Sequence, residues 1–403
     1  MANTLLTIGM ITRRALMVLE NMLTFTKQVN REYDDRYAIA GAKIGTVLDI
    51  RIPPRYTVTT TVALAVQDAV ETKTTLTLNN QHHVDLSFTS QDLTLSIDDF
   101  SDRFIEPAIA ALANKIDAVG LALYADIYNA VGTPGTTPAT LLAYLQAGAK
   151  LDYEAVPRDG KRSAVIEPTA QVVIVDALKG LFHSSMEIEE QYKSGNMGLT
   201  AGLKFSMDQN VVAHTVGPQG GTPLVNGVPV AGATSFLTKG WTAAAASRLV
   251  VGDIFTIASV FAVNPQSRLS TGQLRQFVVT AAFSSDASGN GTVSFQPPMT
   301  ASGQGQTITV LPADGAAITV LGAANTVSPQ NLVFHRNAFT MACVDLVLPG
   351  GVDMAARVSS KKLGISMRLV RQYDINLDAW PCRLDVLYGW KTIRPQLAVR
   401  MPG

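Results

Sequence analysis

Charge is scarce in this chain, and the two signs balance. Only 16% of the 403 residues are charged, with 32 basic residues opposing 32 acidic ones. This excludes a dedicated nucleic-acid-binding protein, which carries a clear excess of Lys and Arg. Apolar residues make up 47% of the chain, which excludes a disordered protein. Low charge with abundant Ala, Val, Thr, Gly and Leu favours a surface that other subunits largely cover.

Cysteine and histidine are also rare. The two cysteines, Cys343 and Cys382, show no metal-ligand spacing, and we expect no structural disulfide in a reducing compartment. Cys343 lies in an apolar run and is predicted to be a small core residue. His82 and His83 are adjacent on a predicted strand, so their side chains point to opposite faces and do not converge on a metal.

Long apolar runs and catalytic motifs are absent. Arg13, Arg14 and Glu20 interrupt the apolar N-terminal segment, and no run reaches membrane-spanning length. There is no G-x-S-x-G, P-loop or dinucleotide fingerprint. His183 and Glu187 are four residues apart, a spacing more typical of a solvated or subunit-contact pair than of a zinc site. We therefore expect no enzyme and no cofactor. A hydrolase with a carbohydrate-binding β module needs paired carboxylates or a Ser/His/Asp set, which the sequence does not offer.

A Thr-rich segment with period-two alternation predicts a long antiparallel hairpin. Apolar residues and threonines alternate from Tyr56 to Val66 and again from Val70 to Leu78. Glu71 and Lys73 lie on its outward face, which lacks the apolar bulk for a second core. A two-stranded ribbon is marginally stable alone in water. We therefore interpret it as an arm that lies on a neighbouring copy of the chain.

Helical and mixed patterns surround this hairpin. Apolar residues at helical spacing from Ile105 to Ile127 predict a long helix. Asp98, Asp99 and Asp102 cap its start, or pair with arginines across an interface. Further predicted helices are 4–30, Thr140–Leu151, Thr169–Leu178 and Met186–Tyr192; predicted strands are Ile44–Ile50, His83–Thr89, Leu93–Ile97 and Ala164–Ile166.

The composition changes near Gly217. From there to Gln330 charged residues almost vanish, and short strands alternate with turns, which predicts an inserted all-β barrel or sandwich. Its predicted strands are Ile254–Ala258, Gln276–Ala282, Gly291–Phe295, Thr307–Leu311 and Ala317–Leu321. The α+β pattern then resumes in Leu332–Leu348, Ile365–Asp374 and Leu384–Leu397.

Short segments spread along nearly the whole chain resemble those of one family. They are Lys43–Val47, Arg51–Pro53, Ala164–Pro168, Gly195–Gly198, Gly202–Phe205, Gly252–Phe255, Tyr388–Trp390 and Arg394–Gly403. In this order they resemble the major capsid (coat) proteins of tailed bacteriophages with the Hong Kong 97 fold, and most closely the podovirus, Salmonella-phage-like subtype with an inserted β-barrel domain.

The resemblance implies an α+β capsid fold in six parts. These are an N-terminal arm and first strand (1–50), an extended β-hairpin loop (51–82), a peripheral domain with a spine helix (83–138), an axial domain (139–216), the inserted barrel (217–330) and a completing segment (331–403). The implied function is self-assembly into an icosahedral phage head that encloses double-stranded DNA. The alternative is the shell of an encapsulin-like cellular nanocompartment of the same fold.

The resemblance also implies partners. They are the chain itself in hexamers and pentamers, a scaffolding protein, a portal protein, a decoration protein and packaged double-stranded DNA by non-specific proximity, without a membrane. A separate scaffolding protein is expected because the arm begins almost at once. The implied location is the virion, after assembly in the host bacterial cytoplasm. Expected subunit-contact residues are Arg31, Glu32, Asp34, Asp35, Arg36, Arg55, Tyr56, Glu71 and Lys73.

Two further expectations concern cationic side chains. Lys73 lies on the hairpin, but the closer relatives do not cross-link a lysine there, so we expect no cross-link. The cations Lys361, Lys362, Arg368 and Arg371 face either packaged DNA or a neighbour's acids, or they form a solvated surface.

Overall fold

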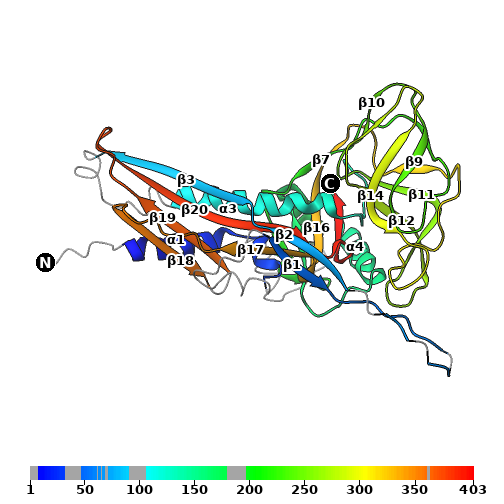
Figure 1. Cartoon of the computed structure of the whole chain (residues 1–403), viewed down its shortest axis with the longest axis horizontal. Helices are drawn as coiled ribbons and strands as arrows, with labels where there is room; N and C mark the ends of the chain where they lie inside the picture. Colours follow the sequence, from blue (N-terminus) through cyan, green and yellow to red (C-terminus); the bar gives the residue numbers. More distant parts are fainter. Residues whose placement is uncertain are drawn as a thin grey trace. The chain divides into compact units, whose positions relative to one another are not determined.

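The computed structural model describes residues 8–31, 47–60, 62–64, 66–68, 71–89, 106–178, 197–360 and 364–403. These residues fall into two compact units, one within residues 1–51, 73–120 and 339–393 and the other within residues 52–72, 121–338 and 394–403. Figure 1 traces their strands and helices along the sequence. Both units contain strands and helices, which confirms the predicted α+β class.

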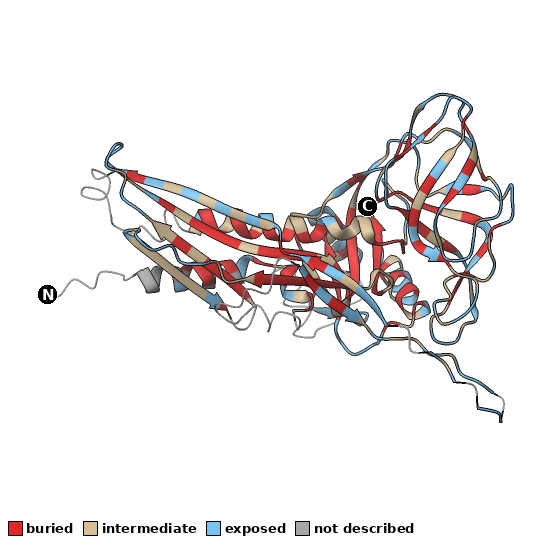
Figure 2. Ribbon diagram, viewed as in Figure 1, coloured by how far each residue is buried: buried red, intermediate tan, exposed pale blue. Residues whose placement is uncertain are grey.

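An antiparallel sheet forms the centre of the first unit. Its order is β17-β20-β19-β18, and β3 pairs with β20 over the full length of β3. Alternate residues of β3 turn inward, with Val84, Leu86 and Phe88 on the less exposed face as predicted. The long strand β20 is mainly buried (Figure 2). The strands are β3 (Asn80–Thr89), β17 (Phe339–Val344), β18 (Met354–Ser360), β19 (Ile365–Arg371) and β20 (Ala379–Thr392), with a separate pair β1 (Val47–Ile52) and β2 (Thr72–Thr77).

Helical segments pack on this sheet through one carboxylate and one aromatic cluster. They are α1 (Ile8–Met22), η1 (Thr26–Gln28) and α3 (Glu106–Leu121). The carboxylate of Asp117 on α3 accepts hydrogen bonds from the backbone N–H groups of Thr24 (2.6 Å) and Thr26 (3.0 Å). The ring of Phe25 stacks on Trp390 of β20 at 5.4 Å between centroids. The segment after α1 is thereby fixed between α3 and the sheet.

The long helix predicted from Ile105 to Ile127 is shorter in the structure than its apolar pattern indicated. It ends at Leu121, and a 3-10 turn, η4 (Ala122–Asp126), continues it. By length and composition alone, Glu106–Asp126 is apolar enough to cross a membrane, so the expectation that no run reaches this length was wrong. However, Ile109, Leu112 and Ile116 are buried in the protein itself, as expected for a core helix.

A second sheet anchors the other unit. Its order is β21-β16-β4-β6-β5, with β7 paired to β16, and only β4 and β6 are parallel. Tyr144 of α4 packs edge-on against Phe205 of β6 at 5.2 Å. The elements are β4 (Arg162–Ile166), β5 (Leu199–Thr200), β6 (Leu203–Met207), β7 (Ala213–Thr215), β16 (Val327–His335), β21 (Ala398–Pro402), α4 (Leu141–Tyr153), α5 (Pro168–Leu178), η5 (Arg336–Ala338) and η6 (Pro395–Leu397).

A nearly closed barrel is inserted between β7 and β16. Six strands follow the order β15-β11-β12-β14-β9-β8, and a bridge between Leu224 and Ala317 brings the two edge strands together. Four phenylalanines, at 236, 255, 277 and 295, pack in its core with ring centroids 5.2–6.0 Å apart. The barrel strands are β8 (Gly221–Val225), β9 (Ala233–Trp241), β11 (Ile254–Val263), β12 (Ser270–Val279), β14 (Gly291–Met299) and β15 (Ile318–Val320). Within the same insertion, β10 (Ala246–Leu249) and β13 (Phe283–Ser285) form a separate two-stranded sheet.

Two predicted strands are wrong. None of residues 53–60 belongs to a strand, although they carry the alternating pattern. Part of the reason is that the backbone N–H and C=O of Thr57 bond to the side-chain amide of Gln67 instead of to a second strand. Residues 307–311 form only an isolated bridge, Ile308 to Ala262. The predictions for Leu93–Ile97 and Met186–Tyr192 fall outside the described residues.

Candidate subunit-contact surface

The loop between β1 and β2 exposes apolar side chains to an exceptional degree. Val58 and Leu64 are each 92% exposed, and Tyr56, Val62 and Val66 are also exposed. Soluble monomers rarely leave such a concentration of apolar groups in water unless a partner covers it. We name residues 53–71 the extended loop.

A reciprocal pair of hydrogen bonds links Thr57 to Gln67 across the extended loop. Thr57 donates its backbone N–H to Oε1 of Gln67 at 2.8 Å, and the Gln67 amide donates back to the Thr57 carbonyl. At its base, Nζ of Lys73 lies 2.8 Å from the Asp49 carboxylate. Both of these side chains are largely exposed, so this ion pair contributes little to folding. Farther along the loop, Nε2 of Gln304 donates a hydrogen bond to the carbonyl of Asp68 at 3.0 Å. The apolar groups of the loop nevertheless remain exposed.

The structure describes five of the nine expected contact residues. Tyr56, Glu71 and Lys73 are exposed, and Arg55 is half-buried. Arg31 is also half-buried and donates a hydrogen bond to the carbonyl of Thr26. The remaining four lie outside the described residues: Glu32, Asp34, Asp35 and Arg36. The sequence thus identified residues of an exposed loop, and Lys73 already has an ion-pair partner within the chain.

Two of the four open cations are neutralised within the first unit. Arg368 forms a bidentate ion pair with Asp385, in which Nε donates to Oδ1 at 3.0 Å and Nη2 donates to Oδ2 at 2.6 Å. Arg371 lies 2.9 Å from Asp353, and its guanidinium sits over the Trp380 ring. This favours a structural role for both arginines over contact with DNA. Lys361 and Lys362 fall outside the described residues.

Within the described residues, His82, His83 and the two cysteines show no catalytic arrangement. Nδ1 of His82 lies 2.6 Å from the Tyr388 hydroxyl, whereas His83 pairs with Asp85 at 2.9 Å. Both cysteines are free and buried, and burial raises the pKa of the Cys382 thiol to about 11. A reactive thiol needs the opposite shift. Within the described part of the chain, no group of His, Cys, Asp and Glu could hold a metal ion. His183 and Glu187 lie outside that part.

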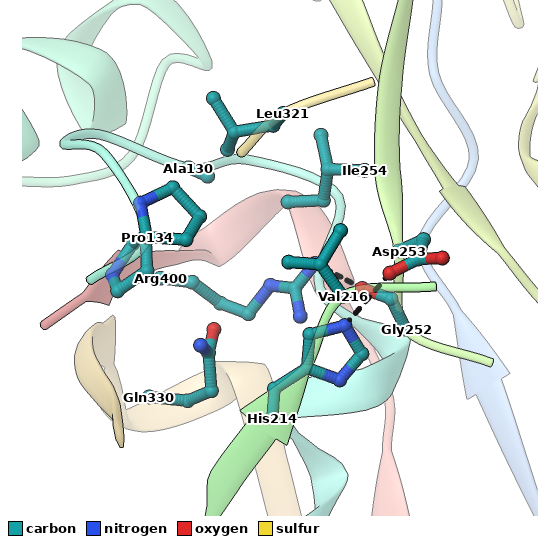
Figure 3. Close-up of a pocket in the computed structure, with 11 residues that line it drawn as sticks. Ala130, Pro134, His214, Val216, Gly252, Asp253, Ile254, Leu321, Gln330 and Arg400 are labelled. Atoms are coloured by element: carbon teal, nitrogen blue, oxygen red, sulfur yellow. Dashed lines mark hydrogen bonds and ion pairs between the residues drawn. The ribbon is translucent and has the colours of Figure 1, made fainter. Parts of the chain in front are cut away.

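Charged residues that the sequence did not single out lie buried where the barrel begins. The Asp253 carboxylate accepts a hydrogen bond from Nε2 of His214 at 2.9 Å and from the backbone N–H groups of Gly217 and Val250. It thereby joins β7, the entry into the barrel and the start of β11. Figure 3 shows His214 and Asp253 near the guanidinium of Arg400. The available signal was the scarcity of charge: a carboxylate in an almost uncharged segment is expected to have a structural purpose.

A second buried cluster joins α4 to the barrel strand β12. Nη1 of Arg275 lies 2.6 Å from the Glu154 carboxylate, and its guanidinium covers the Tyr128 ring at 4.4 Å. Nearby, Nζ of Lys150 donates to the side chain of Gln273 at 3.0 Å. Burial, together with the charge of Arg275, lowers the pKa of Lys150 to about 8. The cluster therefore holds two basic side chains, Arg275 and Lys150, near one carboxylate, that of Glu154.

Several tailed-phage structures are similar to this chain at low sequence identity. A Mycobacterium phage Che8 structure is 13% identical, with 94% of this chain and 90% of that chain covered and a TM-score of 0.47. The capsid of Ralstonia phage GP4 is 7% identical, with coverages of 94% and 87% and a TM-score of 0.45. The capsid of cyanophage P-SCSP1u is 11% identical, with coverages of 89% and 83% and a TM-score of 0.44. A search of curated proteins returned no match.

The assignment rests on a family model. The model described as P22 coat protein, gene protein 5, matches residues 10–403. This range includes the extended loop, both sheets and the inserted barrel. The chain therefore belongs to the P22 coat protein family: it is a major capsid protein that self-assembles into an icosahedral bacteriophage head, a structural component of the virion and not an enzyme.

Proposed function

We propose that the extended loop is the principal contact by which each subunit holds its neighbour in the head. The observation that carries this proposal is its outward apolar surface, of which Val62, Val58 and Leu64 are the most exposed described members. Removing apolar area from water contributes about 25 cal/mol per Å² before the entropic cost of association. Because every copy offers one such loop and covers another, modest contacts accumulate over a closed lattice.

The other parts of the chain complete the proposal. The division into arm, extended loop, peripheral domain, axial domain and inserted barrel is proposed to organise hexamers and pentamers. Arg31, Glu32, Asp34, Asp35 and Arg36 are proposed to support contacts by the arm. A scaffolding protein, a portal protein and a decoration protein are proposed as partners, with assembly in the host bacterial cytoplasm. Because the net charge is zero, packaged double-stranded DNA is proposed to lie near the subunit without a dedicated binding surface.

A loop replacement tests this function. Residues 58–66 are exchanged for a Gly-Ser linker of equal length, which keeps β1 and β2 joined. We expect the variant to remain a folded subunit with the wild-type circular dichroism spectrum, and to form no shells in sedimentation and electron microscopy. The matched control carries Thr59→Ser and Thr60→Ser in the same loop and retains its apolar residues. Normal shells from the linker variant would refute the role of the loop.

A further inference from the structure

Two buried arginines of the second unit differ in how their donors are satisfied. Arg248 donates through Nε to Ser285 (2.9 Å), through Nη1 to the Gln219 carbonyl (3.0 Å) and through Nη2 to the Thr242 carbonyl (2.8 Å). Its guanidinium thus finds protein acceptors in three directions. This is the usual state of a buried arginine, because each unsatisfied buried donor costs about 1–3 kcal/mol.

Arg400 lacks this set of acceptors although it is more deeply buried, at 2% exposure. Its Nη2 donates to the Gly252 carbonyl at 2.7 Å, and the guanidinium lies 5.5 Å from the centre of the Tyr124 ring. Among the described residues, Nε and Nη1 have no hydrogen-bond partner. Burial lowers the pKa of Arg400 to about 10, so the side chain is charged at neutral pH.

The nearby carboxylate does not satisfy these donors. Asp253 already accepts from His214 and from the backbone N–H groups of Gly217 and Val250. Its negative charge offsets that of Arg400 electrostatically, whereas its oxygens accept hydrogen bonds from other donors. The site therefore has charge balance and lacks a hydrogen-bond acceptor.

A cavity of about 10 Å³ adjoins the guanidinium. Its lining includes Arg400, Asp253, Gln330 and Val216, and Figure 3 shows the guanidinium of Arg400 extending between Val216 and Gln330. This volume accommodates about one water-sized particle. It excludes phosphate, sulfate and carboxylate ligands, which have several heavy atoms.

We infer that this cavity is a binding site for one small hydrogen-bond acceptor, a water molecule or a halide ion, held by Nε and Nη1 of Arg400. The acceptor completes a network that joins the C-terminal strand β21 to the start of β11. It therefore helps to fix the barrel on the strand that carries the C-terminus. The site is independent of the extended loop and of the proposed subunit contact.

High-resolution density of the full-length protein tests the inference, with crystals or heads prepared in chloride and in bromide. We expect a compact density about 2.7–3.2 Å from Nε and Nη1. Density without an anomalous bromide signal identifies water. An anomalous peak identifies a halide, in which case replacing chloride by gluconate at equal ionic strength lowers the thermal midpoint. Either result supports the site. Clear density for the Arg400 side chain with nothing beside it would overturn the inference.

Matched variants separate this site from general burial of arginine. Arg400→Met removes both donors, so the density is expected to disappear, whereas Arg248→Met leaves it in place. If Arg400→Met does not fold, the wild-type density alone decides the outcome. Density that persists in Arg400→Met, or wild-type Nε and Nη1 atoms that both bond to protein acceptors, would contradict the proposed role of Arg400.

Discussion

The extended loop offers a quantitative prediction in the double variant Val58→Ser, Leu64→Ser. Each side chain is 92% exposed in the chain, so neither change removes a contact within the subunit. Full burial of a Val or Leu side chain contributes about 1.5–3 kcal/mol. If the neighbour covers both, the variant loses about 3 kcal/mol per loop at the lower end of that range. At 1.4 kcal/mol per factor of ten, the concentration needed for assembly rises on the order of a hundredfold.

Light scattering measures this concentration, and chemical denaturation of the unassembled subunit provides the control. We expect the free energy of unfolding to stay within about 0.5 kcal/mol of wild type, as for other exposed substitutions. The Thr59→Ser, Thr60→Ser variant is expected to assemble at the wild-type concentration. The reasoning is refuted if the double variant assembles at the wild-type concentration, or if the threonine control is impaired to the same extent.

Three further predictions concern stability within the units. Lys150→Met removes a buried ammonium group, whose pKa is about 8 in the folded chain and about 10.5 in the unfolded chain. Because the unfolded chain binds the extra proton between these pH values, the free energy of unfolding of the wild type should rise with pH relative to that of the variant, by at most about 3 kcal/mol. Denaturation series at pH 7 and pH 10 measure this difference. Asp253→Asn turns an amide toward backbone donors and should destabilise the second unit by about 2–4 kcal/mol in thermal unfolding; an unchanged midpoint would contradict the role of Asp253. Gly120→Ala places a methyl group 2.7 Å from a ring atom of Trp390 and should lower the free energy of unfolding by about 1–3 kcal/mol. The control Gly148→Ala has open space around the new methyl group and should be neutral or stabilising. Equal effects of the two changes would refute the packing argument.

Elements with a strong local pattern were predicted well. The helix predicted at Thr140–Leu151 is α4, the one at Thr169–Leu178 is α5, and the alternation of His83–Thr89 gives β3. In each case the periodicity of apolar residues matches the face that becomes buried. The inserted β region was also predicted from its loss of charge.

The extended loop shows where a local pattern is insufficient. Its alternation resembles a strand, but a strand also needs a partner whose backbone groups are in register. Within residues 53–60 no such partner is present, and Thr57 bonds to the side chain of Gln67 instead. The sequence therefore identified an exposed segment, but it predicted the secondary structure incorrectly and an outward face marked by Glu71 and Lys73, whereas the structure also exposes Val58, Val62 and Leu64.

The chain alone determined its class, its inserted β region and its need for partners, because composition and periodicity report how much apolar surface must be covered and on which face. Only the tertiary structure decided that Asp253 meets His214 and that Arg400 meets the Gly252 carbonyl. These partners are 39 and 148 positions apart in the sequence. Short-range patterns carry no information on such pairings, which depend on how strands from distant segments align in one sheet and one barrel.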